Sequence, residues 1–496
     1  MMASAAVGVP TMALPELLDI RNASDADTMI SGLQLDSRKV RPGDLFLALP
    51  GDVHDGRQFI EQAVANGAAA VAAEAPVAGF LDAITVPWVE LPDLRFELGA
   101  LAARFYRNPS SQQHVTGVTG TNGKTTTSRI IGQLTRALGK PCGVIGTLGA
   151  SLCDDMAAAR NTTPDAISLQ QQLSDWLQQG VLAVTMEVSS HALAQGRVNG
   201  LCFETAVYTN LSHDHLDYHG SMEAYGRAKL QLFTNEHLRH AIINADDAFS
   251  PRVRDAVVQE AEVLTYSICG AAADVRVENA HFGVDGVHGE FHTPWGQAEF
   301  SSPLAGDFNL ANMAAAVTAL VVSGEDLGAV LQSVAELNPV PGRMETVPNH
   351  QGLQVVVDYA HTPQALEHVL QALRSQTDGE LVCVFGCGGD RDEEKRQLMG
   401  RVACRLADRV IVTSDNPRSE APGQIMAHIE TGCSGDYTLV EDRGQAISMA
   451  IAGAVSGDCI LIAGKGHEEY QQLDERRIYF SDVAEASKAL AGRSSK

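Results

Sequence analysis

A glycine-rich turn between an apolar segment and a helix-forming segment constrains this chain more than any other feature. From Val115 to Thr127 the chain reads Val-Thr-Gly-Val-Thr-Gly-Thr-Asn-Gly-Lys-Thr-Thr-Thr. The β-branched residues predict a strand before the turn, and Thr125–Leu138 predicts a helix after it. Such a turn directs backbone N–H groups and a helix N-terminus at one point, an arrangement that binds phosphate. The turn therefore predicts an α/β fold with an ATP site.

Within the turn, Lys124 would neutralise the outer phosphates, and the hydroxyl group of Thr125 or Thr126 would bind Mg²⁺. The usual P-loop spacing places a glycine where this chain has Val118, so the turn is a variant of that motif. A turn without a nucleotide is the alternative, which the Gly-Lys-Thr-Thr run between strand and helix disfavours. The expected ATP-binding residues of the turn are Gly120, Thr121, Asn122, Gly123, Lys124, Thr125 and Thr126.

The size and charge of the chain disfavour several classes of partner. Its 496 residues fit about three domains. The net charge is −25, so nucleic acids and anionic membrane surfaces would be repelled overall. No segment resembles a secretory signal or a membrane span, and the nine cysteines include no Cys-x-x-Cys pair. We expect a cytoplasmic protein, a monomer, with no nucleic acid partner and no membrane insertion.

Three strand–loop–helix regions follow one another along the chain, with no internal repeat. The stretches Arg107–Ser111 and Asn338–Gly342 contain prolines with glycine, asparagine or serine, which interrupt regular structure, so we place boundaries there. The sequence predicts a smaller N-terminal α/β domain over 1–112 and a central ATP-binding domain with a P-loop-type parallel sheet over 113–340. A C-terminal Rossmann-like domain is expected over 341–496.

Expected strands place polar residues where ligands bind, because ligands of parallel sheets lie at the carboxyl ends of the strands. In the first region the pattern predicts strands over Leu45–Leu49 and Ala69–Ala73 and a helix over Ile60–Asn66. In the second, the apolar run Val181–Met186 ends at Glu187. Strands that lead into polar loops are expected in the third region over Val355–Val357, Leu381–Phe385, Val410–Thr413 and Cys459–Ile462.

Two side chains near these strand ends are candidate Mg²⁺ ligands. A carboxylate at a strand end beside a phosphate loop can hold Mg²⁺, which favours Glu187 over the alternative of an acid that faces solvent. The segment Asn210–His219 contains three histidines and two aspartates, and we interpret His215 as a ligand to a second Mg²⁺. The alternatives are zinc, which no nearby cysteine supports, and a polar loop that caps a helix beginning near Ser221.

Lys229 lies within an expected helix over Glu223–Phe233. A lysine buried near metal is costly as a cation. It would either pair with an acid or become a carbamate, whose negative charge could bind Mg²⁺. An ordinary surface lysine is the simplest interpretation of the sequence alone.

Arg418 follows Asp415-Asn-Pro, and its planar guanidinium suits bidentate binding of a carboxylate. A substrate with a carboxylate at its far end is therefore implied. Arg391, in the neighbouring glycine loop, could hold another acidic group. The alternative is that Arg418 pairs with Glu420 on the surface, where the pair would contribute little.

Taken together, these motifs resemble those of the Mur ligases, the ATP-dependent amide ligases of peptidoglycan precursor synthesis. The resemblance keeps the order of motifs over nearly the whole chain. The similar blocks are Gly120–Thr126, Glu187–Leu193, Asn210–His219, Asp307–Asn312 and Pro341–Glu345. It implies a three-domain α/β fold, with ATP and Mg²⁺ as cofactors.

The resemblance also implies roles for residues around the nucleotide. The implied catalytic residues are Lys124, Glu187, His215 and Lys229, with Lys229 at the position of the carbamylated lysine of the family. The implied Mg²⁺ ligands are Thr125, Thr126, Glu187, His215 and Lys229. Asn309 and Asn312 would lie near adenine, Arg343 near the phosphates of ATP, and Asp358 near the ribose.

Three further sets are implied to bind the other substrates. The UDP group would contact Leu35, Ser37, Asp52, Val53 and His54. The muramoyl dipeptide would contact Asn161, Thr162, Thr163, Ser189, Gln195 and Arg197. The added amino acid would contact Arg391, Asp415, Asn416, Pro417, Arg418, Gly464 and Glu468.

The Asp-Asn-Pro-Arg site is similar to the version of the family that adds meso-diaminopimelate to UDP-N-acetylmuramoyl-L-alanyl-D-glutamate. Diaminopimelate carries a distal ammonium and a distal carboxylate, whereas lysine carries only the ammonium, so Arg418 finds a partner only in diaminopimelate. One alternative is another ligase of the superfamily, such as a folylpolyglutamate synthase. The other is a nucleotide-binding regulator without catalysis, which would lack one of the four implied catalytic residues, and all four are present.

Overall fold

The computed structural model describes residues 10–19, 27–51, 54–77, 79–80, 84–152, 161–283 and 286–493. Two of the expected UDP contacts, Asp52 and Val53, lie outside these residues. The chain forms two compact units. The first comprises residues 1–117, 141–204 and 235–238, and the second comprises 118–140, 205–234 and 239–496.

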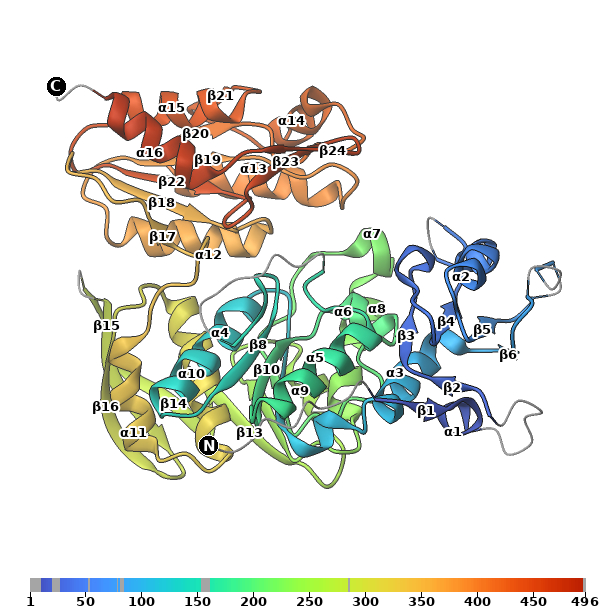
Figure 1. Cartoon of the computed structure of the whole chain (residues 1–496). Helices are drawn as coiled ribbons and strands as arrows, with labels where there is room; N and C mark the ends of the chain where they lie inside the picture. The colour runs from blue at the N-terminus through green and yellow to red at the C-terminus, as the bar shows by residue number, and fades with distance from the viewer. Residues whose placement is uncertain are drawn as a thin grey trace, which may run out of the picture. The chain divides into compact units, whose positions relative to one another are not determined.

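The N-terminal part of the first unit is built on a four-stranded parallel sheet (Figure 1). Its strands are, in spatial order, β3 (Gly32–Gln34), β4 (Asp44–Ala48), β5 (Ala70–Glu74) and β6 (Trp88–Leu91). One face of this sheet packs on α1 (Leu14–Leu18) and α3 (Leu94–Phe105), and the other packs on α2 (Ile60–Ala65). The expected strands and helix of this region are confirmed to within one residue at each end.

The rest of the first unit carries Glu187 at the end of a buried strand. Strand β8 (Cys142–Gly146) pairs in parallel with β10 (Ala183–Glu187) and antiparallel with β9 (Gly149–Ser151). Helix α5 (Ala166–Gln178) begins where the side chain of Asp165 accepts hydrogen bonds from two backbone N–H groups, and the short helix α6 (Ser190–Ala194) follows β10. Every side chain of β10 except that of Ala183 is buried, so the expected strand and its terminal carboxylate are confirmed.

The glycine turn, which belongs to the second unit, follows β7 (His114–Thr119) and leads into α4 (Lys124–Ala137), as the sequence predicts. Helix α10 (Asp307–Val322) lies beside α4 (Figure 1), and their apolar faces share one core with neighbouring strands. Three parallel strands follow in the order β11 (Thr205–Tyr208), β12 (His240–Asn244) and β13 (Glu262–Ser267). Further elements of this part are α7 (Leu216–His219), α8 (Met222–Leu230), α9 (Ser250–Ala256) and α11 (Leu327–Ser333).

The expected parallel sheet of the central region is extended by an antiparallel meander for which the sequence has no clear pattern. Strand β14 (Val275–Gly283) pairs in parallel with β13, and then antiparallel with β15 (Gly286–Thr293), which pairs with β16 (Gly296–Ser302). One face of the meander buries Val287, Phe291 and Phe300 in the core shared with α10.

The C-terminal part of the second unit is a six-stranded sheet in the order β17-β18-β22-β19-β20-β21. The strands are β17 (Glu345–Thr346), β18 (Gln354–Asp358), β19 (Leu381–Phe385), β20 (Arg409–Val412), β21 (Tyr437–Leu439) and β22 (Cys459–Ala463). All pair in parallel except β17. This arrangement confirms the Rossmann-like interpretation and brings the four expected polar loops to one edge of the sheet.

Helices cover both faces of this sheet (Figure 1). One face packs on α12 (Pro363–Arg374), α13 (Glu394–Leu406) and α14 (Pro422–Glu430), and the other packs on α15 (Arg443–Gly453) and α16 (Asp482–Gly492). A hairpin of β23 (Tyr470–Leu473) and β24 (Arg476–Tyr479) follows β22. Cys383 and Cys387 are free thiols buried in the first of these two cores.

Among the described helices, none combines the length and the apolar character needed to cross a membrane.

Candidate active site

The glycine turn has a backbone that only glycine can adopt without strain. Gly120 has a φ of 151°, and a Cβ at this position would lie 1.9 Å from Oγ1 of Thr209. Gly123 has a φ of 87°, and a Cβ there would lie 2.3 Å from Oδ1 of Asn312. Because both positions combine positive φ with close neighbours, the turn is a tight cradle of backbone N–H groups.

Two lysines meet at the same turn. The Nζ of Lys124 donates to the carbonyl oxygens of Gly120 (2.9 Å) and Thr121 (2.8 Å). The Nζ of Lys229, on α8, also donates to the Gly120 carbonyl, at 2.8 Å, and lies 4.3 Å from the centre of the Tyr225 ring. The loop therefore concentrates basic nitrogen atoms where a phosphate chain would lie.

Lys229 is 1% exposed, so its interpretation as a surface lysine is wrong. It forms no ion pair with any carboxylate in the described part of the chain, and therefore the acid-paired alternative is not observed either. Burial, together with the charge of Lys124, lowers the pKa of Lys229 well below its usual value, against the opposing effect of Asp214. A lowered pKa increases the fraction of an amine that is uncharged, and the uncharged amine is the form that reacts with CO₂.

The nucleotide residues predicted outside the turn also gather in the second unit. Arg343 donates from Nη2 to Oγ1 of Thr125 at 3.1 Å and lies 4.6 Å from the centre of the Tyr359 ring. Asp358, at the end of β18, accepts a 2.8 Å hydrogen bond from the backbone N–H of Met344. Thr127 donates to Oδ1 of Asn312 at 3.2 Å.

A cavity of 190 Å³ lies beside these residues, lined among others by Thr126, Leu304, Asn309, Pro339 and Arg343. The side-chain nitrogen of Asn309 donates a hydrogen bond to the Ala305 carbonyl at 2.7 Å. The amide oxygen of the same side chain takes no part in this bond. The buried Nε of Arg343 has no hydrogen-bond partner within the described structure. A mixed apolar and polar cavity next to a phosphate cradle, with a buried guanidinium N–H available, fits a nucleotide.

Glu187 is held at the end of β10 within the first unit. Its two carboxylate oxygens accept hydrogen bonds from the backbone N–H (2.7 Å) and the hydroxyl (3.1 Å) of Thr147. The side chain is 1% exposed, so the alternative of an acid that faces solvent is wrong. A buried carboxylate oriented by hydrogen bonds is a suitable ligand for a hard cation such as Mg²⁺.

The residues predicted to hold the muramoyl dipeptide are linked to the Glu187 strand. Thr163 donates from Oγ1 to the Glu187 carbonyl at 2.8 Å, and its own carbonyl accepts from Nη1 of Arg197 at 3.1 Å. Arg197 also donates to Gln195, and Ser189 lies 3.4 Å from Thr163 between their hydroxyl oxygens. Of the remaining residues, Thr162 accepts from the Thr147 hydroxyl at 3.1 Å, and Asn161 is exposed.

The three described residues predicted to hold the UDP group lie in the N-terminal part. Ser37 donates to Gln62 at 2.7 Å, Leu35 is half-buried, and His54 is exposed.

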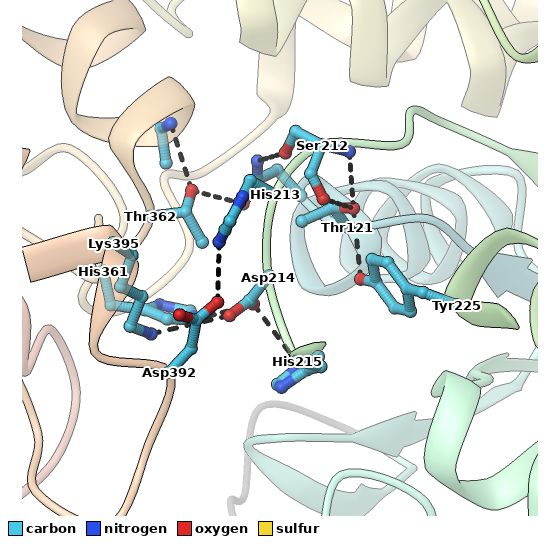
Figure 2. A network of polar contacts seen from close by, with 12 residues as sticks. Thr121, Ser212, His213, Asp214, His215, Tyr225, His361, Thr362, Asp392 and Lys395 are labelled. Carbon is cyan, nitrogen blue, oxygen red and sulfur yellow. Dashed lines mark hydrogen bonds and ion pairs between the residues drawn. The ribbon is translucent and has the colours of Figure 1, made fainter. Parts of the chain in front are cut away.

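Asp214 is the centre of a cluster that no sequence motif indicates (Figure 2). Its carboxylate lies 3.4 Å from Nε2 of His215, 3.7 Å from Nε2 of His361 and 3.5 Å from Nζ of Lys395. Burial acts to raise the pKa of Asp214, but Lys395 and the two histidines together hold it well below its usual value. A charged carboxylate therefore orients the predicted metal ligand, His215.

A second contact lies beside this cluster: His213 and Asp392 approach to 2.7 Å between Nε2 and Oδ2 (Figure 2). Ser221, rather than a histidine, caps α8, because its hydroxyl accepts from the Ala224 N–H at 3.2 Å. Within the described residues, no three His, Cys, Asp or Glu side chains are arranged to hold a metal ion by themselves. Mg²⁺ at this site would therefore need oxygen ligands from the nucleotide and water as well, which is how Mg²⁺ is usually bound.

The loops predicted to bind the added amino acid form one hydrogen-bonded unit at the edge of the C-terminal sheet. Asn416 donates from Nδ2 to Glu468 at 2.7 Å and accepts from Nζ of Lys465 at 3.0 Å. Lys465 also lies 3.2 Å from Glu468. Gly464 has a φ of 118°, and a Cβ there would lie 2.6 Å from a carboxylate oxygen of Asp415. The segments Asp415–Arg418 and Gly464–Glu468 are therefore locked together.

Arg418 does not pair with Glu420, so that alternative is wrong. Glu420 instead binds the fully buried Arg396 at 2.7 Å. The half-buried Arg418 donates from Nη1 to the Gly389 carbonyl at 2.6 Å and forms no ion pair with any carboxylate that the structure describes. Burial, and then the nearby charge of Arg391, lower the pKa of Arg418. This positive charge is suited to bind a carboxylate supplied by a ligand.

Three protein-family sequence models match most of the chain. The model of the Mur ligase family catalytic domain matches residues 29–106, that of the Mur ligase middle domain matches 118–320, and that of the Mur ligase glutamate ligase domain matches 342–466.

Curated relatives and a solved structure agree with these matches. The UDP-N-acetylmuramoyl-L-alanyl-D-glutamate–2,6-diaminopimelate ligase of Pseudomonas aeruginosa is 48% identical over 470 residues, which cover 94% of this chain and 96% of the relative. The ligase of the same name from Ectopseudomonas mendocina is 48% identical over 471 residues, covering 95% and 96%. A solved structure of a ligase of this name is 38% identical, with a TM-score of 0.71, and covers 97% of this chain and 99% of its own.

Proposed function

The chain belongs to the Mur ligase family of ATP-dependent ligases, and we propose that it joins meso-diaminopimelate to UDP-N-acetylmuramoyl-L-alanyl-D-glutamate. The names of the relatives above support this pair of substrates. The structural observation that carries the proposal is Arg418, a half-buried guanidinium with no described carboxylate partner, beside Arg391. Diaminopimelate has a distal carboxylate that could form an ion pair with Arg418.

In the proposed reaction, the side-chain carboxylate of D-glutamate attacks the γ-phosphorus of ATP, which gives an acyl phosphate and ADP. The free amine of diaminopimelate then attacks the acyl carbon. The tetrahedral intermediate expels inorganic phosphate, and loss of a proton from nitrogen leaves an amide. The residues of the chain contribute mainly by position and charge, because phosphoryl transfer needs little else from a protein.

The phosphate cradle would stabilise the charge that moves during the first step. Lys124 and the loop N–H groups would face the phosphates, and Arg343, which donates a hydrogen bond to Thr125, would contact them from the same side. Mg²⁺ would neutralise phosphate charge when bound. Its proposed ligands are Thr125, Thr126, Glu187, His215 and the carbamate of Lys229. Asp214 would keep His215 in a fixed orientation.

The amino-acid site would select diaminopimelate by charge. Arg418 and Arg391 would bind the distal carboxylate, and Asp415 and Glu468 would face the distal ammonium. L-Lysine would satisfy the two acids and leave Arg418 unpaired. An unpaired charge in a desolvated site costs on the order of 3 kcal/mol. This cost corresponds to a preference for diaminopimelate over L-lysine of more than about a hundredfold.

The domain boundaries near residues 112 and 340, the cytoplasmic location and the monomeric state belong to this proposal. To test the function, the purified protein is incubated with ATP, Mg²⁺, UDP-N-acetylmuramoyl-L-alanyl-D-glutamate and meso-diaminopimelate, and the products are identified by mass spectrometry. We expect ADP and a nucleotide-linked tripeptide in equal amounts. ADP without any new amide, or a new amide formed with no consumption of ATP, would contradict the proposal.

A further inference from the structure

Arg443 is a buried arginine that joins two strands which do not pair with each other. It is the first residue of α15 and is 1% exposed. Its Nη2 donates to the carbonyl of Ala463 at 2.9 Å, and its Nη1 donates to the carbonyl of Ser414 at 3.3 Å. Ala463 ends β22 and Ser414 lies just beyond β20, and both strands pair with β19 between them. The guanidinium therefore spans the carboxyl end of β19.

Asp482 holds this guanidinium in place. It is the first residue of α16, which lies against α15 (Figure 1). Its carboxylate oxygens lie 2.7 Å from Nε and 2.7 Å from Nη2 of Arg443, and both side chains are fully buried. Apolar side chains of similar volume commonly stabilise a core as well as a buried ion pair does. The distinct contribution of this ion pair is to fix the positions of two backbone carbonyls, those of Ser414 and Ala463.

Those two carbonyls stand directly before the two loops of the amino-acid site. Ser414 precedes Asp415–Arg418, and Ala463 precedes Gly464–Glu468. The two loops meet in the hydrogen bond between Asn416 and Glu468. We propose that Arg443, held by Asp482, is a positioning residue for the amino-acid substrate: it sets the spacing of the two loops that bind diaminopimelate. This inference rests on the proposed function, because that function assigns the loops to diaminopimelate.

Gln471 on β23 holds the first loop from the opposite side. Its Nε2 donates to the hydroxyl of Ser414 at 2.9 Å and to the carbonyl of Asp415 at 2.7 Å. The next residue, Gln472, donates from its backbone N–H to Oδ1 of Asn416 at 2.9 Å. Two side chains thus hold the backbone of Ser414 and Asp415: the fully buried Arg443 and the half-buried Gln471.

Removing the contacts of Arg443 or Gln471 should weaken the binding of diaminopimelate and leave the binding of ATP unchanged. A shift of one loop relative to the other would move Arg418 and Asp415 away from Glu468, and small displacements of binding groups cost affinity steeply. The phosphate cradle is built from other residues and would keep its geometry. The KM for diaminopimelate should therefore rise, while the KM for ATP stays constant. Discrimination between diaminopimelate and L-lysine should fall, which a loss of overall stability would not cause.

The test compares three variants of the full chain by steady-state phosphate release. Arg443→Lys keeps the charge beside Asp482 but cannot reach both carbonyls. Gln471→Leu removes the outer contact at a half-buried site, and serves if Arg443→Lys does not fold. The control, Arg374→Lys, alters an arginine at the other end of the same sheet, where Arg374 pairs with Asp408 at 2.7 Å and donates to the carbonyls of Thr377 and Gly379.

We expect Arg443→Lys to raise the KM for diaminopimelate by about tenfold or more, Gln471→Leu to raise it less, and Arg374→Lys to leave it unchanged. Both site variants should lose part of the preference for diaminopimelate over L-lysine. If the site variants lower the melting temperature but keep the KM and the preference of the wild type, the positioning role is refuted while the proposed function stands. A wild type without diaminopimelate-dependent turnover would overturn the proposed function and this inference with it.

Discussion

The amino group of Lys229 donates a hydrogen bond to the carbonyl of Gly120 at 2.8 Å, so a buried lysine on α8 is tied directly to the phosphate-binding turn. Burial, and then the charge of Lys124, lower the pKa of Lys229 well below its usual value, which favours the uncharged form of the amine. An uncharged amine can combine with CO₂ to give a carbamate and a proton. This places a prospective anion beside the loop that would carry ATP and Mg²⁺.

Replacing this lysine should abolish catalysis without unfolding the protein. In Lys229→Met the carbamate cannot form, and we expect turnover to fall by about a hundredfold or more. The control is Lys140→Met, because Lys140 is exposed and pairs with Glu325. In ¹³C NMR with labelled bicarbonate, a carbamate signal should be present in the wild type and in Lys140→Met, and absent from Lys229→Met. A Lys229→Met variant with wild-type turnover would contradict the role.

The conformation of the glycine turn predicts a strict requirement at residue 123. In Gly123→Ala the new Cβ would meet Oδ1 of Asn312 at 2.3 Å, and the φ of 87° is unfavourable for alanine. We expect ATP affinity, measured by calorimetry, to fall by about tenfold or more. Gly423→Ala is the matched control, because no atom lies within 4 Å of a Cβ at this position in α14. Equal ATP affinities for the two variants would show that the turn does not bind the nucleotide.

The half-buried His467 predicts how stability depends on pH. Burial, and then the charges of Arg343 and Lys465, lower the pKa of His467 to about 4. The unfolded chain therefore takes up this proton near pH 6.5, whereas the folded protein takes it up only near pH 4. Since the unfolded state binds more protons in this window, stability is lost as the pH falls through it, by about 2 kcal/mol at pH 5.

His467→Gln should remove this part of the acid sensitivity. The melting temperature of the variant should decline less than that of the wild type between pH 6.5 and 4. A His288→Gln control, at an exposed position of β15, should follow the wild-type profile. Parallel curves for His467→Gln and the wild type would mean that the histidine is not held uncharged in the folded protein.

Local patterns were sufficient to predict many elements of this fold. The strand expected over Leu381–Phe385 coincides with β19, because five consecutive buried apolar residues between polar loops allow little else. The turn from Gly120 to Lys124 and its following helix were likewise predictable, since glycine and helix signals act within a few residues. The meander β14–β16 could not be predicted in this way, because its exposed and buried residues alternate with many interruptions.

Contacts between residues far apart in the sequence could not be predicted. Asp214 meets Lys395 across 181 positions, and neither residue carries a local signal of that contact. In the same way, Glu420 lies two residues from Arg418 but pairs with the buried Arg396. The burial of Lys229 depends on which face of α8 turns inward, which a short helix with mixed residues does not reveal.

The central claim is that Arg418 selects diaminopimelate by binding its distal carboxylate. The most direct test measures phosphate release with meso-diaminopimelate and with L-lysine, each at a saturating concentration of ATP and of the UDP-linked dipeptide, for the wild type and for Arg418→Leu. We predict that the wild type prefers diaminopimelate by about a hundredfold or more in kcat/KM, and that Arg418→Leu loses most of this preference. A variant that still prefers diaminopimelate as strongly as the wild type would contradict the account.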